Sequence, residues 1–259
     1  MLRKPLLNKA AALLLLALFS IAVSSCEQDF VEPTSGGVAF PDDIAALFNT
    51  PYTANNLTCT TPSCHASQNS VNGLDLTDWQ KTMNGSQNGS MVVPYNGFWS
   101  YMFSVLNADT LYGPVSTVAL PEYHKLDSSK VNLVRNWIDG GAKSKDGRVA
   151  LTDQPLNRKI FITNQASDLV AVVNTDNRLI TRLIPVGGRA NQLDAPHYVN
   201  LSHDGRFFFV SLIQEGYLEK YETNADYPFA RSGRVACGLS PAHIEISPGD
   251  QFGYISNFD

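Results

Sequence analysis

The chain has 259 residues, of which 44% are hydrophobic, and a formal net charge of −5. This length and composition allow one or two domains with a sizeable buried core. Charged residues make up only 17% of the chain and their balance is acidic, so the sequence has no basic footprint for nucleic acid. We therefore expect no nucleic-acid partner.

The first 25 residues have the pattern of a signal peptide. Arg3, Lys4 and Lys9 form a positively charged start. Residues 10–23 then form an uncharged, mostly apolar run that is too short to span a bilayer comfortably. We expect residues 1–25 to be removed and the rest of the chain to lie outside the cytoplasm.

A short motif that ends in Cys26 follows this run. The segment VSSC at residues 23–26 resembles a bacterial lipobox, in which the peptidase cuts before the cysteine and the cysteine is lipidated. Several acyl chains give stable anchoring, whereas one chain is marginal. The acidic start EQD at residues 27–29 resembles the export signal of surface lipoproteins in Bacteroidota. The resemblance implies an outer-membrane lipid anchor facing the periplasm or cell surface. Pro33 and the Gly-Gly pair at residues 36–37 predict that residues 26–40 form a flexible tether. An ordinary secretory signal with a free Cys26 is the alternative.

Helical patterns follow the tether. We expect helices at residues 41–48, 98–106 and 128–139. The last is the clearest, because Asp127 or Ser128 can cap its start and a Gly-Gly pair at residues 140–141 can end it. Asn-Gly pairs predict turns between the helices. These patterns predict a small, mostly helical and loop-rich domain.

The segment CTTPSCH, residues 59–65, carries the most specific chemistry in the chain. A disulfide between Cys59 and Cys64 suits an oxidising compartment but gives His65 no role. A zinc site would need a fourth ligand, and His124 is the only other histidine of this domain. Haem c uses all three residues, with a thioether from each thiol and the histidine on the iron. Four residues separate the cysteines instead of the usual two, so the spacer must bulge outward in a turn.

Further motifs follow the cysteines in a fixed order. They are GLDL at residues 73–76, VVP at residues 92–94 and WIDGGA at residues 137–142. With the cysteine segment, they resemble the planctomycete-type cytochrome c domains over the span from Cys59 to about Gly147. The resemblance implies a haem c that is attached through Cys59 and Cys64, with His65 as the proximal iron ligand.

The distal iron ligand that is common in that family is absent from the corresponding position of this sequence. Such domains commonly place a Met-Pro pair just before the last helix, and the methionine binds the iron. This chain has Leu120-Pro121 there, and leucine cannot bind iron. His124, on the same loop, is the candidate distal ligand, with a solvated loop histidine as its alternative. Met91 and Met102 are the fallbacks, and a five-coordinate iron is a further alternative.

The pattern changes to short β-rich runs after a linker at residues 144–157. Such runs occupy residues 159–164, 169–173 and 180–186. Residues 196–207 match residues 241–252, 45 positions later, and Asp204-Gly205 predicts a hairpin turn inside the unit. A period of this length is typical of β-propellers. The amino-acid sequence of the repeated units resembles that of YVTN-type propellers over residues 158–259. About 100 residues suffice for about two blades of an incomplete propeller.

His197 and His243 of this second region have a sharper and a simpler interpretation, and His197 has the placement that the sharper one requires. His197 precedes a strand and an SxxGR turn, like the histidine that binds a d-type haem in nitrite reductases with a propeller. Pro-His before such a strand is also common in propellers without haem, which favours the simpler interpretation. Cys237 is expected to be a buried small hydrophobe.

The predicted fold class is a small, mostly α cytochrome c domain at residues 41–147 followed by an all-β partial propeller at residues 158–259. The predicted function is that of a membrane-anchored c-type cytochrome that transfers electrons to or from a redox partner protein. We see no nucleophile–base constellation in the sequence, so an electron carrier is favoured over a catalyst. The alternatives are an oxidoreductase whose propeller holds a substrate or second haem, and a non-redox binding lipoprotein with a Cys59–Cys64 disulfide.

Overall fold

The computed structural model of the chain describes residues 37–52, 56–66, 70–118, 121, 124–152, 154–224 and 226–258. These residues belong to one unit, Gly37–Asp259. The expected signal peptide and Cys26 lie outside the described residues, as does most of the tether, so all three stay predictions. The boundary between a first and a second domain also stays a prediction.

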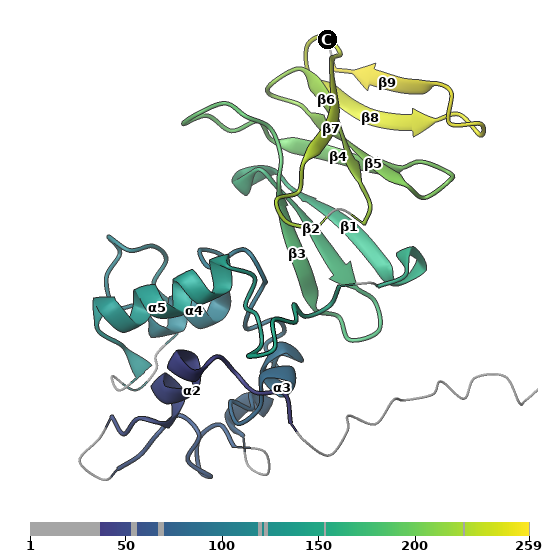
Figure 1. The fold of residues 1–259 in the computed structure, drawn as a ribbon. Helices are drawn as coiled ribbons and strands as arrows, with labels where there is room; N and C mark the ends of the chain where they lie inside the picture. Colours follow the sequence, from purple (N-terminus) through teal and green to yellow (C-terminus); the bar gives the residue numbers. More distant parts are fainter. Residues whose placement is uncertain are drawn as a thin grey trace, which may run out of the picture. The chain divides into compact units, whose positions relative to one another are not determined.

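Short helices occupy the first half of this unit (Figure 1). The α-helices of the described part are α2 (Asp42–Asn49), α3 (Trp79–Met83), α4 (Tyr101–Leu106) and α5 (Ser128–Asp139). Short 3-10 turns lie at η1 (Val71–Gly73), η3 (Leu156–Arg158) and η4 (Gln165–Ser167). None of the helices within the described ranges is long and apolar enough to cross a membrane.

The predicted mostly helical first domain is wrong. Its α-helices are only 8, 5, 6 and 12 residues long, and irregular segments and turns join them. The turn glycines explain much of the difference, because Gly73, Gly85 and Gly89 have φ values of +72°, +79° and +89° and cannot continue a helix. The described part of the chain is dominated instead by nine β-strands in three sheets.

Helix α5 is the element that the sequence predicted best. The side chain of Asp127 accepts a hydrogen bond from the backbone N–H of Lys130 and caps the helix. At the other end, Gly141 N–H donates to Ile138 O and Ala142 N–H to Trp137 O, each at 2.9 Å. This pair of bonds is the Schellman motif, which needs a residue with positive φ after the C-cap.

Replacement of Gly141 by alanine is expected to lower the free energy of unfolding by about 1–3 kcal/mol, the usual cost of a strained non-glycine backbone. Gly141 has φ +102°, and a Cβ atom there would lie 2.6 Å from Cε1 of Tyr95. Gly249→Ala is the control, since its nearest neighbour would be Gln251 Cγ at 3.8 Å. Urea unfolding of both variants tests this, and equal midpoints would contradict it.

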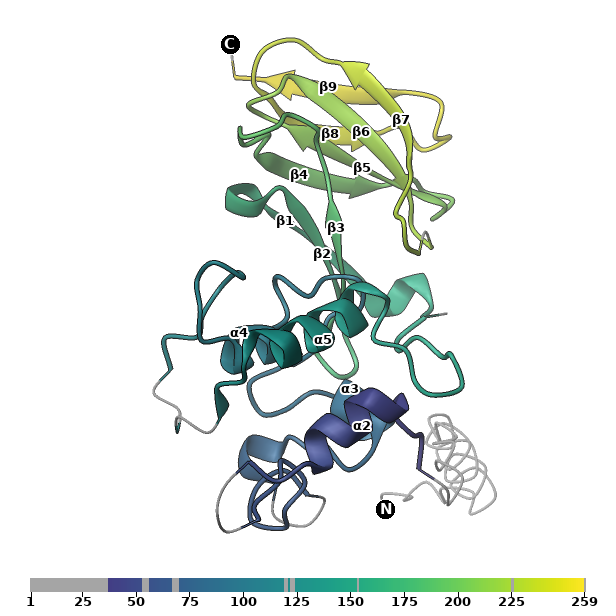
Figure 2. The ribbon, with the colours of Figure 1, turned by 60° about the vertical axis from the view of Figure 1, so that its left-hand side comes forward.

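The second half of the unit is built from three antiparallel sheets (Figures 1 and 2). The first contains β1 (Lys159–Asn164), β2 (Leu169–Asn174) and β3 (Ile180–Pro185). The second contains β4 (Pro196–Leu201), β5 (Phe207–Leu212), β6 (Tyr217–Glu222) and β7 (Arg231–Ala236). The third contains β8 (Pro241–Ile246) and β9 (Gly253–Asn257). The expected two blades are thus replaced by sheets of three, four and two strands, in which the first strands β1, β4 and β8 pack in series.

The internal repeat is confirmed in the strand register. Leu201 pairs with Phe208 across the β4–β5 hairpin, and Ile246 pairs with Gly253 across the β8–β9 hairpin. Each residue of the second pair lies 45 positions after its counterpart. The predicted turn is also present, because Gly205 has φ +71° and its N–H donates to Ser202 O at 3.0 Å.

Apolar side chains form separate clusters in the two halves. The cluster around α2, α3 and α5 includes Ile44, Trp79 and Ile138, all nearly fully buried. A second cluster lies among the sheets. The VVP segment contributes to both halves, because Val92 packs in the first cluster whereas Val93 packs against β2 and β3. Burial of these side chains provides the main driving force for folding.

Candidate functional site

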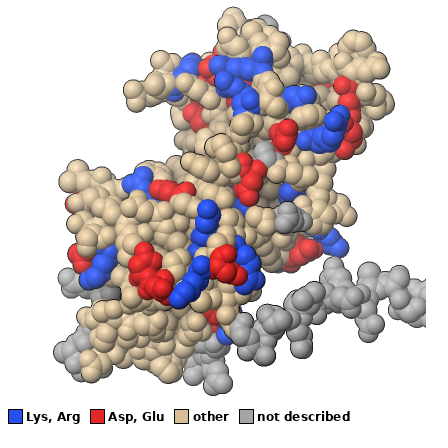
Figure 3. Space-filling model, viewed as in Figure 1, with Lys and Arg blue, Asp and Glu red and all other residues tan. Residues whose placement is uncertain are grey.

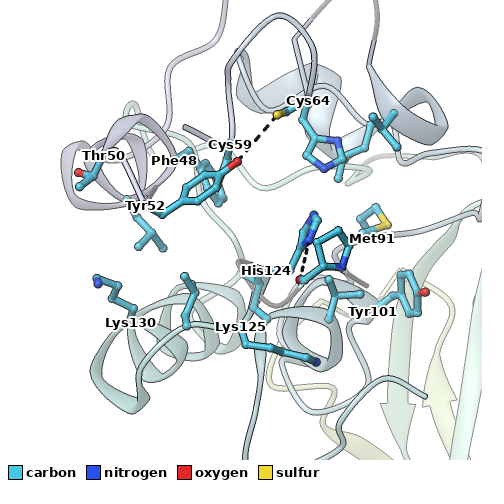
Figure 4. A pocket seen from close by; sticks show the side chains of 18 of the residues that line it. Phe48, Thr50, Tyr52, Cys59, Cys64, Met91, Tyr101, His124, Lys125 and Lys130 are labelled. Carbon is cyan, nitrogen blue, oxygen red and sulfur yellow. Dashed lines mark hydrogen bonds between the residues drawn. The ribbon is translucent and has the colours of Figure 1, made fainter. Parts of the chain in front are cut away.

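A pocket of about 700 Å³ lies in the helical half, and the CTTPSCH segment forms part of its wall (Figure 4). Apolar side chains from α2, α4 and α5 complete the wall, among them Phe48, Leu106 and Leu133. The loop before α5 contributes the imidazole of His124. The volume falls within the range of small-molecule and cofactor sites, about 300–1,000 Å³.

The spacer between the two cysteines folds into the predicted turn. Cys64 N–H donates to Thr61 O at 2.8 Å, and His65 N–H donates to Cys59 O at 3.1 Å. The side chain of Thr61 also accepts from the backbone N–H of Thr58 at 2.8 Å. These bonds fold the spacer back on itself, so Cys59, Cys64 and His65 all reach the same pocket despite the four residues between the cysteines.

Both cysteines of this segment are free thiols. Burial, together with a smaller contribution from the nearby Cys64, raises the pKa of Cys59 to about 11, although a backbone hydrogen bond acts in the opposite direction. Cys59 is therefore protonated at neutral pH. The sulfur of Cys64 lies 3.8 Å from the hydroxyl of Tyr52 at the pocket wall (Figure 4).

His65 presents a buried ring nitrogen without a partner. Its Nδ1 is buried and makes no hydrogen bond. Burial lowers the pKa of His65; backbone hydrogen bonds at Leu74 and Val71 raise it in part, and His124 lowers it. The imidazole is therefore neutral near pH 7, the form that binds metal ions. An orphaned buried nitrogen beside two thiols in a pocket of this size fits the haem that the sequence predicted.

His124 faces His65 in this pocket. The two ring centres are 6.2 Å apart and the ring planes are inclined by 70°. The Nδ1 of His124 is hydrogen-bonded to the carbonyl oxygen of Pro121 at 3.2 Å. Leu120, which occupies the family's methionine position, lies outside the described residues.

The two fallback methionines differ in position. Met91 lines the pocket, although it is also packed in the apolar cluster of the helical half. Met102 is 3% exposed and lies in that cluster without lining the pocket. The structure thus keeps His124 and Met91 as residues that can reach the site and places Met102 in the core.

Tyr52 and Lys125 are among the pocket residues that were not predicted from the sequence. Tyr52 follows α2 in an irregular segment, where no periodicity marks it. Lys125 is adjacent to His124 in sequence, and its ammonium donates to Asn107 O at 2.8 Å. Burial lowers the pKa of Lys125. The position next to a candidate ligand was the only signal that could have identified this lysine.

The remaining sequence candidates do not line this pocket. Gln165 Nε2 and His197 Nδ1 are 2.6 Å apart, and the His197 ring contacts Phe258. Cys237 is half-buried, whereas full burial was predicted. Within the described segments, no group of three or more His, Cys, Asp or Glu side chains is placed to hold a metal ion.

No family model matches the chain, and no curated protein matches it. Similar solved structures include hydrazine synthase of Kuenenia stuttgartiensis, at 21% identity over 41% of this chain and 28% of that chain, with a TM-score of 0.35. The dihydro-haem d1 dehydrogenase NirN in complex with DHE matches at 12% identity over 68% of this chain and 40% of that chain, with a TM-score of 0.34. A Bacteroides uniformis protein described as a 6-phosphogluconolactonase matches at 18% identity over 40% of this chain and 31% of that chain, with a TM-score of 0.33.

These similar structures include β-propeller-like proteins. The chain spans only 28%, 40% and 31% of the three solved chains. With TM-scores of 0.35 or less, the alignments carry no argument about this chain's fold or activity.

Proposed function

We propose that Cys59 and Cys64 attach a haem c covalently and that His65 binds its iron. The observation that supports this most is that all three side chains line one pocket of about 700 Å³, although four residues separate the cysteines. The unpartnered buried Nδ1 of His65 is a second support, because a buried polar atom normally has a partner.

The state of the thiols suits the attachment chemistry. Each thiol would add its S–H across a vinyl C=C bond, forming one C–S bond and one C–H bond and consuming the S–H bond and the π bond. The addition needs no oxidant. The bound group supplies one-electron transfer, whereas the protein supplies the axial ligands and the apolar surroundings that tune the potential.

We propose electron transfer outside the cytoplasm as the function, with a redox protein as partner. The signal-peptide and lipobox patterns of residues 1–26 support an extracytoplasmic, membrane-anchored chain. Charged side chains of both signs are interspersed on the face drawn in Figure 3, so the partner is expected to be another protein rather than nucleic acid.

Haem staining after denaturing electrophoresis tests the proposal. The full chain, produced with a haem-c maturation system, is expected to be red and to keep its haem through denaturation, with a mass increase of one haem. A colourless protein in which alkylation after denaturation shows Cys59 and Cys64 joined as a disulfide would support the non-redox alternative and contradict the proposal.

Membrane attachment through Cys26 is tested separately. The mature protein is expected to enter the detergent phase, because lipidation buries acyl chains at about 0.8 kcal/mol per CH₂ group. A Cys26→Ala variant is expected either to remain unprocessed or to be released as a soluble protein. Equal detergent partition of a correctly processed Cys26→Ala protein would rule out the lipobox.

A further inference from the structure

The spacing of the two pocket histidines matches that of two ligands on one metal ion. Metal–imidazole bonds are about 2.0 Å long and a ring nitrogen lies about 1.1 Å from its ring centre, so imidazoles on opposite sides of one metal have centres about 6 Å apart. The ring centres of His65 and His124 are 6.2 Å apart. Because His65 and His124 are 59 positions apart in sequence, this spacing reflects the folded chain.

The hydrogen bond of His124 sets the correct tautomer for a ligand. A carbonyl oxygen can only accept, so the 3.2 Å contact with Pro121 O requires Nδ1 to carry the proton. The neutral ring then has its lone pair on Nε2. Metal-binding histidines almost always donate their other N–H in this way, which fixes the ring and raises its basicity.

From this geometry we infer that His124 is the second axial ligand of the proposed haem, so that the iron is held between His65 and His124. The inference rests on the proposed haem attachment and replaces the methionine expected at position 120. Met91 is the competitor because it lines the same pocket. Its side chain is 6% exposed and packs in the apolar cluster, the usual role of a buried methionine.

The two ligand sets have different spectra and potentials. Methionine ligation raises a haem potential relative to ligation by two histidines. We expect the unmutated, haem-loaded protein to be low-spin in both oxidation states, to lack the near-infrared methionine–iron charge-transfer band of ferric haem, and to have a low potential. Near-infrared magnetic circular dichroism of the unmutated protein decides between the two sets without any variant.

Variants of the full, haem-loaded chain test the assignment directly. His124→Gly is expected to become high-spin or water-bound while keeping its covalent haem. Added imidazole should then restore the low-spin spectrum, which a purely structural role would not predict. Met91→Leu should leave the spectrum unchanged, as should the control His203→Ala at the surface hairpin between β4 and β5.

The outcomes separate this inference from the proposed function. A methionine–iron band in the unmutated protein, or a low-spin His124→Gly protein that does not respond to imidazole, would overturn His124 ligation while covalent haem would still stand. Absence of covalent haem from the unmutated protein would overturn both. If His124→Gly does not accumulate, the near-infrared spectrum of the unmutated protein still gives a decision.

Discussion

Replacement of both Cys59 and Cys64 by alanine is expected to remove all haem that resists denaturation. Among the residues that the structure describes, these two thiols are the only cysteine sulfurs that line the pocket, and a thioether needs a sulfur within bonding reach of the macrocycle. Loss of both leaves His65 as a non-covalent ligand only, and denaturation then releases the group. The measurement is haem stain per mole of protein after denaturing electrophoresis, and we expect it to fall to background.

The single variants and a matched cysteine control sharpen this test. Cys59→Ala and Cys64→Ala should each keep one thioether, so each should still stain but show the haemochrome band of a haem with one remaining vinyl group. Cys237→Ala should behave like the unmutated protein, because this thiol lies outside the pocket and contacts Val235 O at 3.5 Å. Denaturation-resistant haem in the double variant would show that the attachment assignment is wrong.

Local structure could be predicted where the sequence signals agree with one another. Helix α5 has the predicted bounds because its cap, its apolar face and its glycine end all point to the same element. Strand β1 matches for a similar reason, since a β-branched run lies between turns. The helix expected at residues 98–106 begins only at Tyr101. The residues before it form a turn in which the Ser100 N–H donates a hydrogen bond to the carbonyl oxygen of Gly97.

The fold class could not be predicted, because it depends on what share of the residues lies in irregular segments between the helices and strands. The helical patterns predicted a mostly helical domain, whereas positive-φ glycines keep most of that segment irregular. Strand β7 gave no signal either: RSGRVA lacks alternation, and five of its six residues are exposed. Its pairing with β6 and the contacts of Arg231 and Arg234 with Glu219 keep it in the sheet.

The candidate site was predictable in part. Cys59, Cys64 and His65 are neighbours in sequence, so their common pocket follows from one local turn. The approach of His124 depends on the loop before α5 and on packing of α5 against α2 and α4, which no spacing rule gives. Sequence order suggested His124 only as a replacement for the missing methionine.

A buried carboxylate holds the four-stranded sheet to the loop that precedes it. Glu219 of β6 is fully buried, and its Oε2 accepts from Gly187 N–H at 2.8 Å and from the Tyr221 hydroxyl at 2.7 Å. Its Oε1 contacts Arg231, and Arg234 Nε lies 3.5 Å away. Basic side chains gather over β6 and β7 on the face drawn in Figure 3.

A β-bulge brings both arginines to this one carboxylate. Tyr221 pairs with Arg231 and Lys220 with Gly233, so Ser232 is an extra residue in β7. Residues three apart on a regular strand would face opposite sides of the sheet. Because of the extra residue, both arginine side chains lie on the same side of the sheet. The carboxylate therefore contacts two arginines, a hydroxyl and a backbone N–H.

Glu219→Gln is expected to destabilise the protein by about 1.5–3 kcal/mol, the usual contribution of hydrogen bonds to a charged group, because the arginines around this carboxylate are themselves partly exposed. The neutral amide would leave Arg231 without its counter-charge, whereas Arg234 would keep its ion pair with Glu215. Its N–H donors would also face groups that are themselves donors. Glu222→Gln is the matched control on the same strand, because Glu222 is exposed and an exposed change usually stays within about 0.5 kcal/mol. Tyr221→Phe should fall between them, at about 1 kcal/mol for one lost hydrogen bond. Urea unfolding followed by circular dichroism measures all three, and a Glu219→Gln midpoint equal to that of Glu222→Gln would show that this cluster does not hold the sheet.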